Sequence, residues 1–372
     1  MKLIHTADWH LGKLIQGVYM TEDQDYILQQ FIEAIKEEKP DAVIIAGDLY
    51  DRAVPPTEAV ELLNRTLERI VLHLGVPVLA VAGNHDSPDR LDFGTNILAG
   101  QGLHLAGRLR PDLEPVVLQD DHGEVHFHLV PYADPALVRN LLGEDKVKSH
   151  DEAMEAIVTA IHSRMDPQAR HVFVGHAFVT PDGEKRSNTS DAERPLSIGG
   201  AEYVRAEHFD PFHYTALGHL HQAHFVGNDT VRYAGSLLKY SASEANHRKG
   251  YLTVHIDEDG QVTTKKKELV PRRDMRRIEA YIDEIDRQEP SEDYVFVTLL
   301  DENPVLFPME KVRAVYPNAL HVERRTNLER FDSSAEQPDT NRKLELDPVA
   351  LFASFYEEVK GMPLEKAKQE RF

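Results

Sequence analysis

Five short polar motifs, separated by long stretches of chain, each follow a hydrophobic run. They are Asp8-Trp9-His10, Gly47-Asp48, Gly83-Asn84-His85-Asp86, Gly175-His176 and Gly218-His219-Leu220-His221. The runs before them have strand character, and the first three alternate with segments of helical periodicity, which is typical of a layered α/β fold. Loops that leave the carboxyl ends of such strands converge at one edge of a sheet, so we expect the five motifs to meet there.

The donor groups in these motifs are carboxylates, an amide and imidazoles. Thiolate ligands are excluded because the chain of 372 residues contains no cysteine. Oxygen and nitrogen donors suit hard or borderline divalent ions such as Mn2+, Mg2+, Fe2+ or Zn2+. Asp48, with two carboxylate oxygens on a short stem, is the natural bridge between two ions. The other predicted ligands are Asp8, His10 and His221 for the first ion, and Asn84, His176 and His219 for the second.

Two divalent ions held about 3.5 to 4 Å apart acidify a bound water and neutralise the charge of a phosphate. The predicted chemistry is therefore hydrolysis of a phosphate ester. His85, next to Asn84 but not itself expected to bind an ion, is placed to assist the leaving oxygen. Asp86 would orient the imidazole of His85, and a turn-stabilising role for Asp86 is the alternative. Any one motif could be a core or capping group, but five in this order favour a site.

The overall charge bears on the substrate. The chain has 63 acidic residues against 42 Lys and Arg, a net charge of -21, which by itself argues against a nucleic-acid ligand. Phosphate contacts, however, need only a local basic face. The candidate DNA-binding residues are Lys265, Lys266, Lys267, Arg272 and Arg273. The alternative is that these residues form a solvated strand end and linker.

The length and pattern of the chain predict more than one domain. Strand-rich segments at residues 224–226, 231–233, 250–256 and 262–268 are expected to complete a second sheet against the first. The predicted organisation is residues 1–270 as the catalytic domain, 272–331 as a small α/β domain, 332–346 as a polar linker and 347–372 as a helical segment. The N-terminus lacks a signal-peptide core, and no apolar run approaches the ~20 residues of a membrane span, so we expect a cytoplasmic protein without membrane contact.

The last predicted helix has clear end signals. Asp347 is a good N-cap, Pro348 suits the first helical position and Gly361 is a stop signal. Its apolar face consists of Leu351, Phe352, Phe355, Tyr356 and Val359. An apolar helix face beyond a linker is expected to be buried against another surface. That surface is either the rest of the same chain or, as we favour, a partner protein.

The order of the five motifs is similar to that of the calcineurin-like metallophosphoesterase superfamily. Within it, the chain resembles the bacterial nuclease subunits that work with an SbcC-type ATPase. The segments that carry this second resemblance are residues 5–12, 46–51, 82–87, 216–221, 233–236 and 249–251. The resemblance implies a two-sheet sandwich flanked by helices, a small α/β capping domain at residues 272–331 and a C-terminal helical tail.

The resemblance also implies a function. Such relatives are Mn2+-dependent DNA nucleases, acting as 3′ to 5′ exonucleases on double-strand ends and as endonucleases on single strands and hairpins, in DNA repair, recombination and replication. It implies a homodimer that forms a heterotetramer with the SbcC-type ATPase, on whose coiled coil residues 347–372 would dock. The family's metal ligands match the seven named above, and its phosphate-contacting histidine matches His85. Asp51 is a departure, because archaeal and eukaryotic relatives usually carry histidine there.

Two other functions fit the same motifs. One is a small-molecule phosphodiesterase or phosphomonoesterase, and the other is a scaffold without catalysis. The extra domain and tethered helix argue against the first, and the complete ligand set argues against the second. The helices expected at residues 57–74 and 90–99 are the predicted dimer contact, with apolar residues such as Leu62 and Ile97, although an ordinary core explains these residues equally well.

Overall fold

The structure is a computed structural model that describes residues 1–182, 191, 193 and 202–325. It divides into one unit at Met1–Arg276 and a second that begins at Arg277. The linker and tail lie outside the described residues. The same holds for the predicted partner-binding side chains Leu351, Phe352, Phe355, Tyr356 and Val359.

The first sheet of the larger unit has six strands in the order β16-β15-β1-β4-β5-β6. Their bounds are β16 Val262–Glu268, β15 Gly250–Ile256, β1 Lys2–Thr6, β4 Ala42–Ala46, β5 Val78–Val81 and β6 Leu103–Ala106. Strands β1, β4, β5 and β6 are parallel, so their carboxyl ends share one edge. Strand β4 is buried on both faces, which explains its unbroken apolar sequence.

The second sheet also has six strands, in the order β13-β14-β12-β9-β8-β7. Their bounds are β13 His224–Val226, β14 Asn228–Tyr233, β12 Tyr214–Gly218, β9 Arg170–His176, β8 Gly123–Val130 and β7 Val116–Asp120. The prediction that all strands after residue 222 join this sheet is wrong, because β15 pairs antiparallel with β1 and carries β16 with it into the first sheet. The pattern of apolar residues in a sequence indicates that a strand is buried, but it does not indicate which strand it pairs with.

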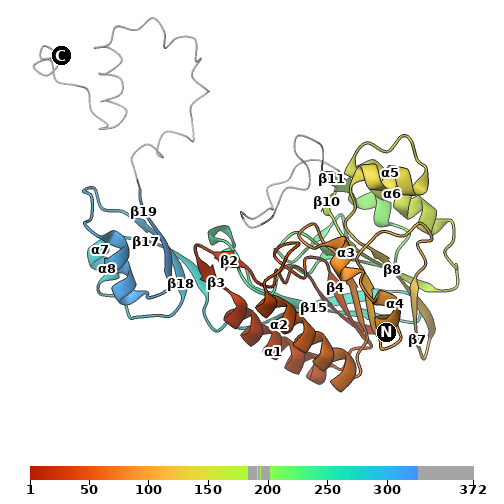
Figure 1. Cartoon of the computed structure of the whole chain (residues 1–372), viewed down its shortest axis with the longest axis horizontal. Coiled ribbons are helices and arrows are strands. Elements are labelled where there is room, and N and C mark those ends of the chain that lie inside the picture. The colour runs from red at the N-terminus through yellow and green to blue at the C-terminus, as the bar shows by residue number, and fades with distance from the viewer. Residues whose placement is uncertain (183–190, 192, 194–201, 326–372) are drawn as a thin grey trace, which may run out of the picture. The chain divides into compact units, whose positions relative to one another are not determined.

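The two sheets pack face to face and helices cover their outer sides, as expected (Figure 1). Leu3, Ile44 and Phe127 belong to the buried cluster between the sheets. Helices α1 (Thr21–Glu38) and α2 (Thr57–Glu68) lie beside the first sheet, and α2 continues through a π-helical turn at Arg69–His73. Helices α5 (Pro135–Leu142) and α6 (His150–His162) lie on the second sheet, where Ile157 and Ile161 of α6 cluster with Phe173 of β9.

Shorter elements complete the larger unit. They are β2 Leu14–Ile15, β3 Val18–Tyr19, α3 Pro88–Leu91, α4 Thr95–Ala99, β10 Phe178–Thr180, β11 Tyr203–Arg205 and the 3-10 helices η2 Ala206–Phe209 and η3 Ala242–Glu244. In the part of the chain that the structure describes, no helix combines the length and apolarity needed to cross a membrane.

The smaller unit contains a three-stranded sheet in the order β17-β18-β19. Its elements are β17 Met275–Ala280, α7 Ile282–Ile285, β18 Tyr294–Leu299, α8 Pro308–Val315 and β19 Ala319–Arg324. Ile285, Val297 and Val312 form part of its own buried core. Strands and helices alternate along this segment, as in the small α/β domain that the sequence predicts, and α7 is a single turn that follows closely after β17. A capping role for this unit stays a prediction.

Candidate metal centre

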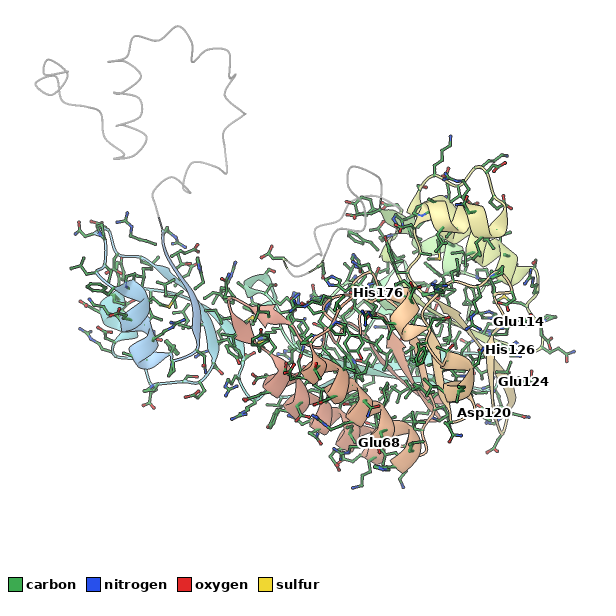
Figure 2. The ribbon with its side chains drawn as sticks, in the orientation of Figure 1. Glu68, Glu114, Asp120, Glu124, His126 and His176 are labelled. Carbon is green, nitrogen blue, oxygen red and sulfur yellow. The ribbon has the colours of Figure 1, made fainter. Side chains whose placement is uncertain are left out.

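The predicted ligands come from both sheets and lie at or just after the carboxyl ends of five strands. Asp8 and His10 follow β1, Asp48 follows β4, Asn84 follows β5, His176 ends β9, and His219 and His221 follow β12. Figure 2 marks His176 inside the larger unit, among the strands of the two sheets. The amide of Asp8 donates to the carbonyl of Gly47 at 3.0 Å, and that of His219 donates to Asp8 Oδ1 at 2.9 Å. Segments more than two hundred residues apart are thus in direct contact.

Four of the predicted ligands have left-handed backbone conformations that residues other than glycine seldom adopt. The φ angles are 54° at Asp8, 46° at His10, 52° at Asp48 and 104° at His219. Such conformations are costly and persist only where the surrounding structure holds them, which is common at functional sites. One contact that stabilises these conformations is the hydrogen bond from the amide of His10 to the carbonyl of Asp48, at 3.0 Å.

Asp8, His10 and His221 form the first group of potential ligands. One ligand atom from each lies within 4.8 Å of the others, and His10 Nε2 is 3.0 Å from His221 Nε2. These two nitrogens are close enough together to bind the same ion. Burial lowers the pKa of both histidines, which favours the neutral form that binds metals. Asp8 Oδ2 is buried and has no hydrogen-bond partner among the described residues, so it too fits an ion.

The second group consists of Asp8, Asp48 and His176. His176 Nε2 lies 3.4 Å from Asp48 Oδ2 and 2.9 Å from Asn84 Oδ1, while its Nδ1–H donates to the carbonyl of Ala46 at 3.0 Å. Burial opposes protonation of His176, but the carboxylate of Asp48 outweighs it and raises the pKa to about 9. A bound cation would compete with that proton.

Asp48 belongs to the second group and also lies close to the first. Its Oδ1 accepts the amide of His85 at 2.9 Å, while Oδ2 is 3.6 Å from His10 Nε2 and 3.4 Å from His176 Nε2. Burial alone would raise the pKa of Asp48, yet the neighbouring histidines hold it well below its usual range. The buried, ionised carboxylate of Asp48 thus approaches a histidine of each group, and its bridging role stays a prediction.

Asn84 and His219 are predicted ligands outside these groups, and both lie next to His176. The ring of His219 packs edge-on against that of His176 with 5.4 Å between centroids, and burial lowers the pKa of His219 well below the usual value. The set as a whole contains buried carboxylates, imidazoles and an amide oxygen, and it has no thiolate, which fits a divalent ion.

His85 and Asp51 lie beside the first group. His85 Nδ1–H donates to the carbonyl of Asp51 at 2.8 Å, and its ring packs edge-on against that of His10 with 4.7 Å between centroids. Asp51 Oδ1 lies 2.8 Å from Lys13 Nζ and 3.7 Å from His10 Nδ1. Asp51, the position at which the chain departs from the archaeal and eukaryotic pattern, thus contacts both His10 and His85.

Asp86 contacts backbone amides. Its Oδ2 accepts from Leu49 at 3.1 Å and from Gly83 at 3.0 Å, and its Oδ1 accepts from Tyr50 at 2.9 Å. Burial and the charge of Asp48 raise its pKa to about 7. These contacts tie the loop after β5 to the loop after β4, as the turn-stabilising alternative requires. The carbonyl of Asp51, rather than Asp86, is the hydrogen-bond partner that orients His85.

Residues that the sequence analysis did not select also support the site. Gln24 is 1% exposed, its Oε1 accepts the amide of Gly12 at 3.0 Å, and its Nε2 donates to the carbonyl of His10 at 2.7 Å and to Tyr240 at 3.1 Å. The sequence signal that could have identified Gln24 is its place as a polar residue on the apolar face of α1, one turn before Ile27 and Leu28. Glu244, whose Oε1 lies 3.1 Å from His221 Nδ1, was not selected either, and Lys249 was noted only as part of the segment 249–251.

The candidate DNA-binding residues are largely engaged with acidic neighbours. Lys267 lies 2.7 Å from Glu38, Arg273 lies 3.0 Å from Asp23, and Arg272 lies 3.8 Å from Glu22. Lys266 donates to the carbonyl of Arg248 at 2.5 Å. These ion pairs favour the alternative of a solvated strand end, and a role for Lys265 or its neighbours in DNA binding stays a prediction.

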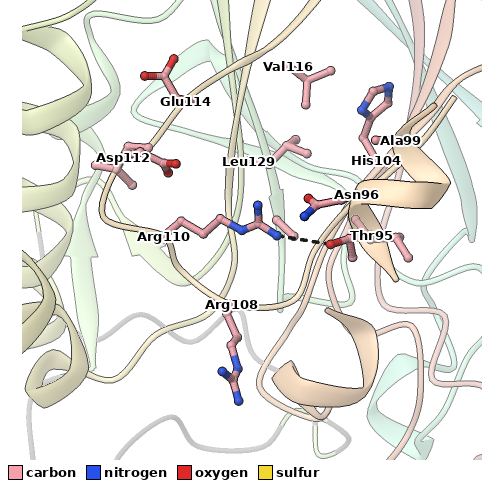
Figure 3. Close-up of a pocket in the computed structure, with 13 residues that line it drawn as sticks. Thr95, Asn96, Ala99, His104, Arg108, Arg110, Asp112, Glu114, Val116 and Leu129 are labelled. Carbon is pink, nitrogen blue, oxygen red and sulfur yellow. Dashed lines mark hydrogen bonds between the residues drawn. The ribbon is translucent and has the colours of Figure 1, made fainter. Parts of the chain in front are cut away.

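A separate crevice of about 160 Å³ lies beside α4 and β6 (Figure 3). Arg110 donates to Thr95 Oγ1 at 3.2 Å and lies 3.6 Å from Asp92, and Arg108 donates to Asp89 at 2.5 Å. These arginines hold the loop after β6 against α3 and the residues beside it. None of the predicted metal ligands lines the crevice.

Comparison with known proteins defines the class. Residues 1–223 match the family model for calcineurin-like phosphoesterases, which is more than half of the chain. Residues 271–360 match a model described as the type 5 capsule protein repressor C-terminal domain. The fold, the ligand-bearing edge and this match together define a calcineurin-like phosphoesterase.

Two curated relatives narrow the assignment, and both carry the name of the D subunit of the nuclease SbcCD. The protein of Staphylococcus saprophyticus is 34% identical over 97% of this chain and 94% of its own length. That of Staphylococcus epidermidis is 32% identical over 100% of this chain and 96% of its own length. The chain belongs to the SbcD family of calcineurin-like phosphoesterases. The expectations of family and fold are thus confirmed.

Proposed function

We propose that this protein is a metal-dependent DNA nuclease that hydrolyses phosphodiester bonds as the partner of an SbcC-type ATPase. The observation that carries the proposal is that Asp48 Oδ2 lies 3.6 Å from His10 Nε2 of the first group and 3.4 Å from His176 Nε2 of the second. That arrangement suits two ions side by side, and full-length similarity to nuclease subunits supplies the substrate class. The roles are DNA end processing, repair and recombination in the cytoplasm.

The proposed ligand assignment is that of the sequence analysis, and the two groups of potential ligands support it in part. Asp8, His10 and His221 would hold the first ion, Asn84, His176 and His219 the second, and Asp48 would bridge them. When bound, the ions supply an activated water and neutralise the phosphate. We choose Mn2+ because the family resemblance implies it, and oxygen and nitrogen donors without thiolate allow it, although intrinsic affinity favours later transition metals.

His85 would act on the substrate. Its Nδ1–H is committed to the carbonyl of Asp51 at 2.8 Å, so the ring is fixed and its Nε2 is the atom free for a phosphate oxygen or the leaving group. Lys13, in the segment between β1 and β2, places a cation 2.8 Å from Asp51. With the end polarity of the family, cleavage would be 3′ to 5′ on duplex ends and endonucleolytic on single strands and hairpins.

A homodimer is the proposed assembly, with a heterotetramer formed by two ATPase subunits. A groove of about 540 Å³ between α2 and the segment after α3 is lined by apolar side chains that include Val60, Leu72 and Phe93. Phe93 is 86% exposed and nearby Ile97 is 80% exposed, a concentration of apolar surface that is unusual for a monomer. Leu62, predicted as a contact residue, is instead buried in the core.

A nuclease assay tests the function. We expect end-labelled duplex, hairpin and single-stranded DNA to be degraded by the purified protein with Mn2+, and much more slowly with a chelator. Nitrophenyl phosphate should be a poor substrate. Intact DNA together with rapid cleavage of nitrophenyl phosphate would instead identify a small-molecule phosphoesterase.

A further inference from the structure

A buried ion pair lies directly behind His221. Glu244, the last residue of η3, is 0% exposed, and its Oε2 is 2.5 Å from Nζ of Lys249, which is 7% exposed. Glu244 Oε1 accepts from His221 Nδ1 at 3.1 Å. Buried charges are retained only where they are paired and hydrogen-bonded, so this pair needs an explanation.

The hydrogen bond to Glu244 determines which nitrogen of His221 carries the proton. An ionised carboxylate can only accept, so the proton of the neutral ring is on Nδ1. The lone pair is then on Nε2, the atom 3.0 Å from His10 Nε2. Glu244 therefore turns the metal-binding nitrogen of His221 toward the first ligand group, as carboxylates behind metal-binding histidines commonly do.

Glu244 is itself held by several contacts. Ser241 Oγ donates to Glu244 Oε1 at 3.1 Å, and Lys249 Nζ also donates to Ser236 Oγ and to the carbonyl of His221, each at 2.8 Å. Lys249 thus fixes the backbone of His221 while Glu244 fixes its ring. Because the pair is neutral overall, it adds orientation without adding net charge beside the ligands.

The same segment reaches the other histidine of the first group. Tyr240 donates to the carbonyl of Trp9 at 2.5 Å and accepts from Gln24, which also donates to the carbonyl of His10. One stretch of chain, residues 236–249, therefore braces both His10 and His221. The contacts to Asp48, Asn84 and His176 come from other segments.

We propose that Glu244 is the positioning residue of the first metal site, setting the Nδ1–H tautomer and ring direction of His221, with Lys249 as its anchor. The proposal rests on the metal centre of the proposed function. It assigns Glu244 no contact with substrate. Loss of its acceptor oxygen should weaken the site of Asp8, His10 and His221 and leave that of Asn84 and His176 intact.

Two double variants separate the hydrogen bond from the ion pair. Glu244→Leu with Lys249→Met removes both charges and the acceptor, and Glu244→Gln with Lys249→Met removes both charges but keeps an acceptor for His221 Nδ1–H. Apolar replacement of both members of a buried pair is usually tolerated, so both proteins should fold, which thermal unfolding checks. Mn2+ binding is measured by titration and by the EPR signal of the coupled ion pair.

We expect the Leu/Met protein to lose about 10- to 100-fold in affinity for one of two ions, and to show isolated rather than coupled Mn2+. The Gln/Met protein keeps the acceptor but lacks the anchor, so it should lose less affinity than the Leu/Met protein and keep the coupled signal. Unchanged binding in the Leu/Met protein, or an equal loss in both variants, would overturn the proposal.

A second measurement is independent of metal. In ¹⁵N-histidine spectra of the metal-free full chain, His221 should be the Nδ1–H tautomer in wild type and in the Gln/Met protein, and should shift toward Nε2–H in the Leu/Met protein. An Nε2–H tautomer in wild type would refute the proposed role. Wild-type protein in which His221 has the predicted Nδ1–H tautomer but which binds fewer than two ions would contradict the metal centre alone.

Discussion

Gly83 lies directly against the carboxylate of Asp48. A β-carbon at residue 83 would overlap Asp48 Oδ1 and its backbone nitrogen, so only glycine permits the loop after β5 to approach the loop after β4. The amide of Gly83 also donates to Asp86 at 3.0 Å. The glycine of the Gly-Asn-His-Asp motif is therefore required for the position of the proposed bridging ligand.

Gly83→Ala should displace Asp48 and weaken metal binding about 10- to 100-fold, with a loss of stability of about 1–3 kcal/mol from overpacking. Mn2+ titration and chemical denaturation measure the two effects. Gly100→Ala is the matched control, because a β-carbon at residue 100 meets only a carbonyl oxygen at 3.5 Å. Normal Mn2+ binding by Gly83→Ala would contradict the argument.

His85→Ala should separate turnover from metal binding. The side chain donates to the carbonyl of Asp51 and is not a proposed ligand, so Mn2+ content should be normal while cleavage of duplex ends falls about 10²- to 10⁴-fold. Asp48→Asn should lose both Mn2+ binding and DNA cleavage, because it removes the charge of the proposed bridging carboxylate. Metal analysis and a nuclease assay on the same preparations measure the two effects. If the His85→Ala protein lacks metal, His85 belongs to the ligand set instead.

Glu38 makes the stability of the larger unit depend on pH. Its carboxylate is 2.7 Å from the ammonium groups of both Lys2 and Lys267, and these hydrogen bonds lower its pKa from 4.5 to about 2. A lowered folded-state pKa contributes stability above pH ~4.5 that is lost as the pH falls toward 2. Glu38→Gln should therefore cost about 1 kcal/mol at pH 7, since the pairs are partly solvated.

Urea denaturation at a series of pH values tests this expectation. The difference between wild type and Glu38→Gln should shrink as the pH is lowered from 6 to about 3. Glu37→Gln, at the exposed neighbouring position, is the control and should change little. A difference that is constant with pH would mean that Glu38 stabilises the protein by something other than its charge.

Ile97→Asp should convert the proposed dimer to a monomer. Ile97 is 80% exposed beside the apolar groove between α2 and the segment after α3, and a buried carboxylate in an interface is costly. Light scattering after size-exclusion chromatography measures the mass. Leu137→Asp, at a residue 48% exposed on α5, should leave the mass unchanged. A wild-type protein that is monomeric at all concentrations would refute the dimer.

Deletion of residues 341–372 should leave Mn2+-dependent cleavage of short single strands intact, because every proposed ligand lies before residue 222. The deleted segment carries the apolar stripe Leu351, Phe352, Phe355, Tyr356 and Val359. Binding to an SbcC-type ATPase should therefore be lost in a co-purification experiment. Retention of the ATPase by the truncated chain would place the docking surface elsewhere.

Much of the site could be predicted from sequence because its signals are local. A buried strand such as Ala42–Ala46 followed by Gly47 and Asp48 carries its own burial pattern, turn residue and ligand within a few positions. The parallel order of β1, β4 and β5 then brings those turns to one edge. The segment between residues 103 and 162 has weaker periodicity, so its strands β6, β7 and β8 could not be assigned from the pattern alone.

The sequence by itself determined which donors could meet an ion and that the strand ends would present them, since glycine turns and apolar runs act over short distances. Only the tertiary structure decided that β15 pairs with β1, that Asp86 binds backbone amides, and that Glu244 lies behind His221. Those contacts join segments that are distant along the chain. Their formation depends on how two sheets pack, which no local pattern of residues specifies.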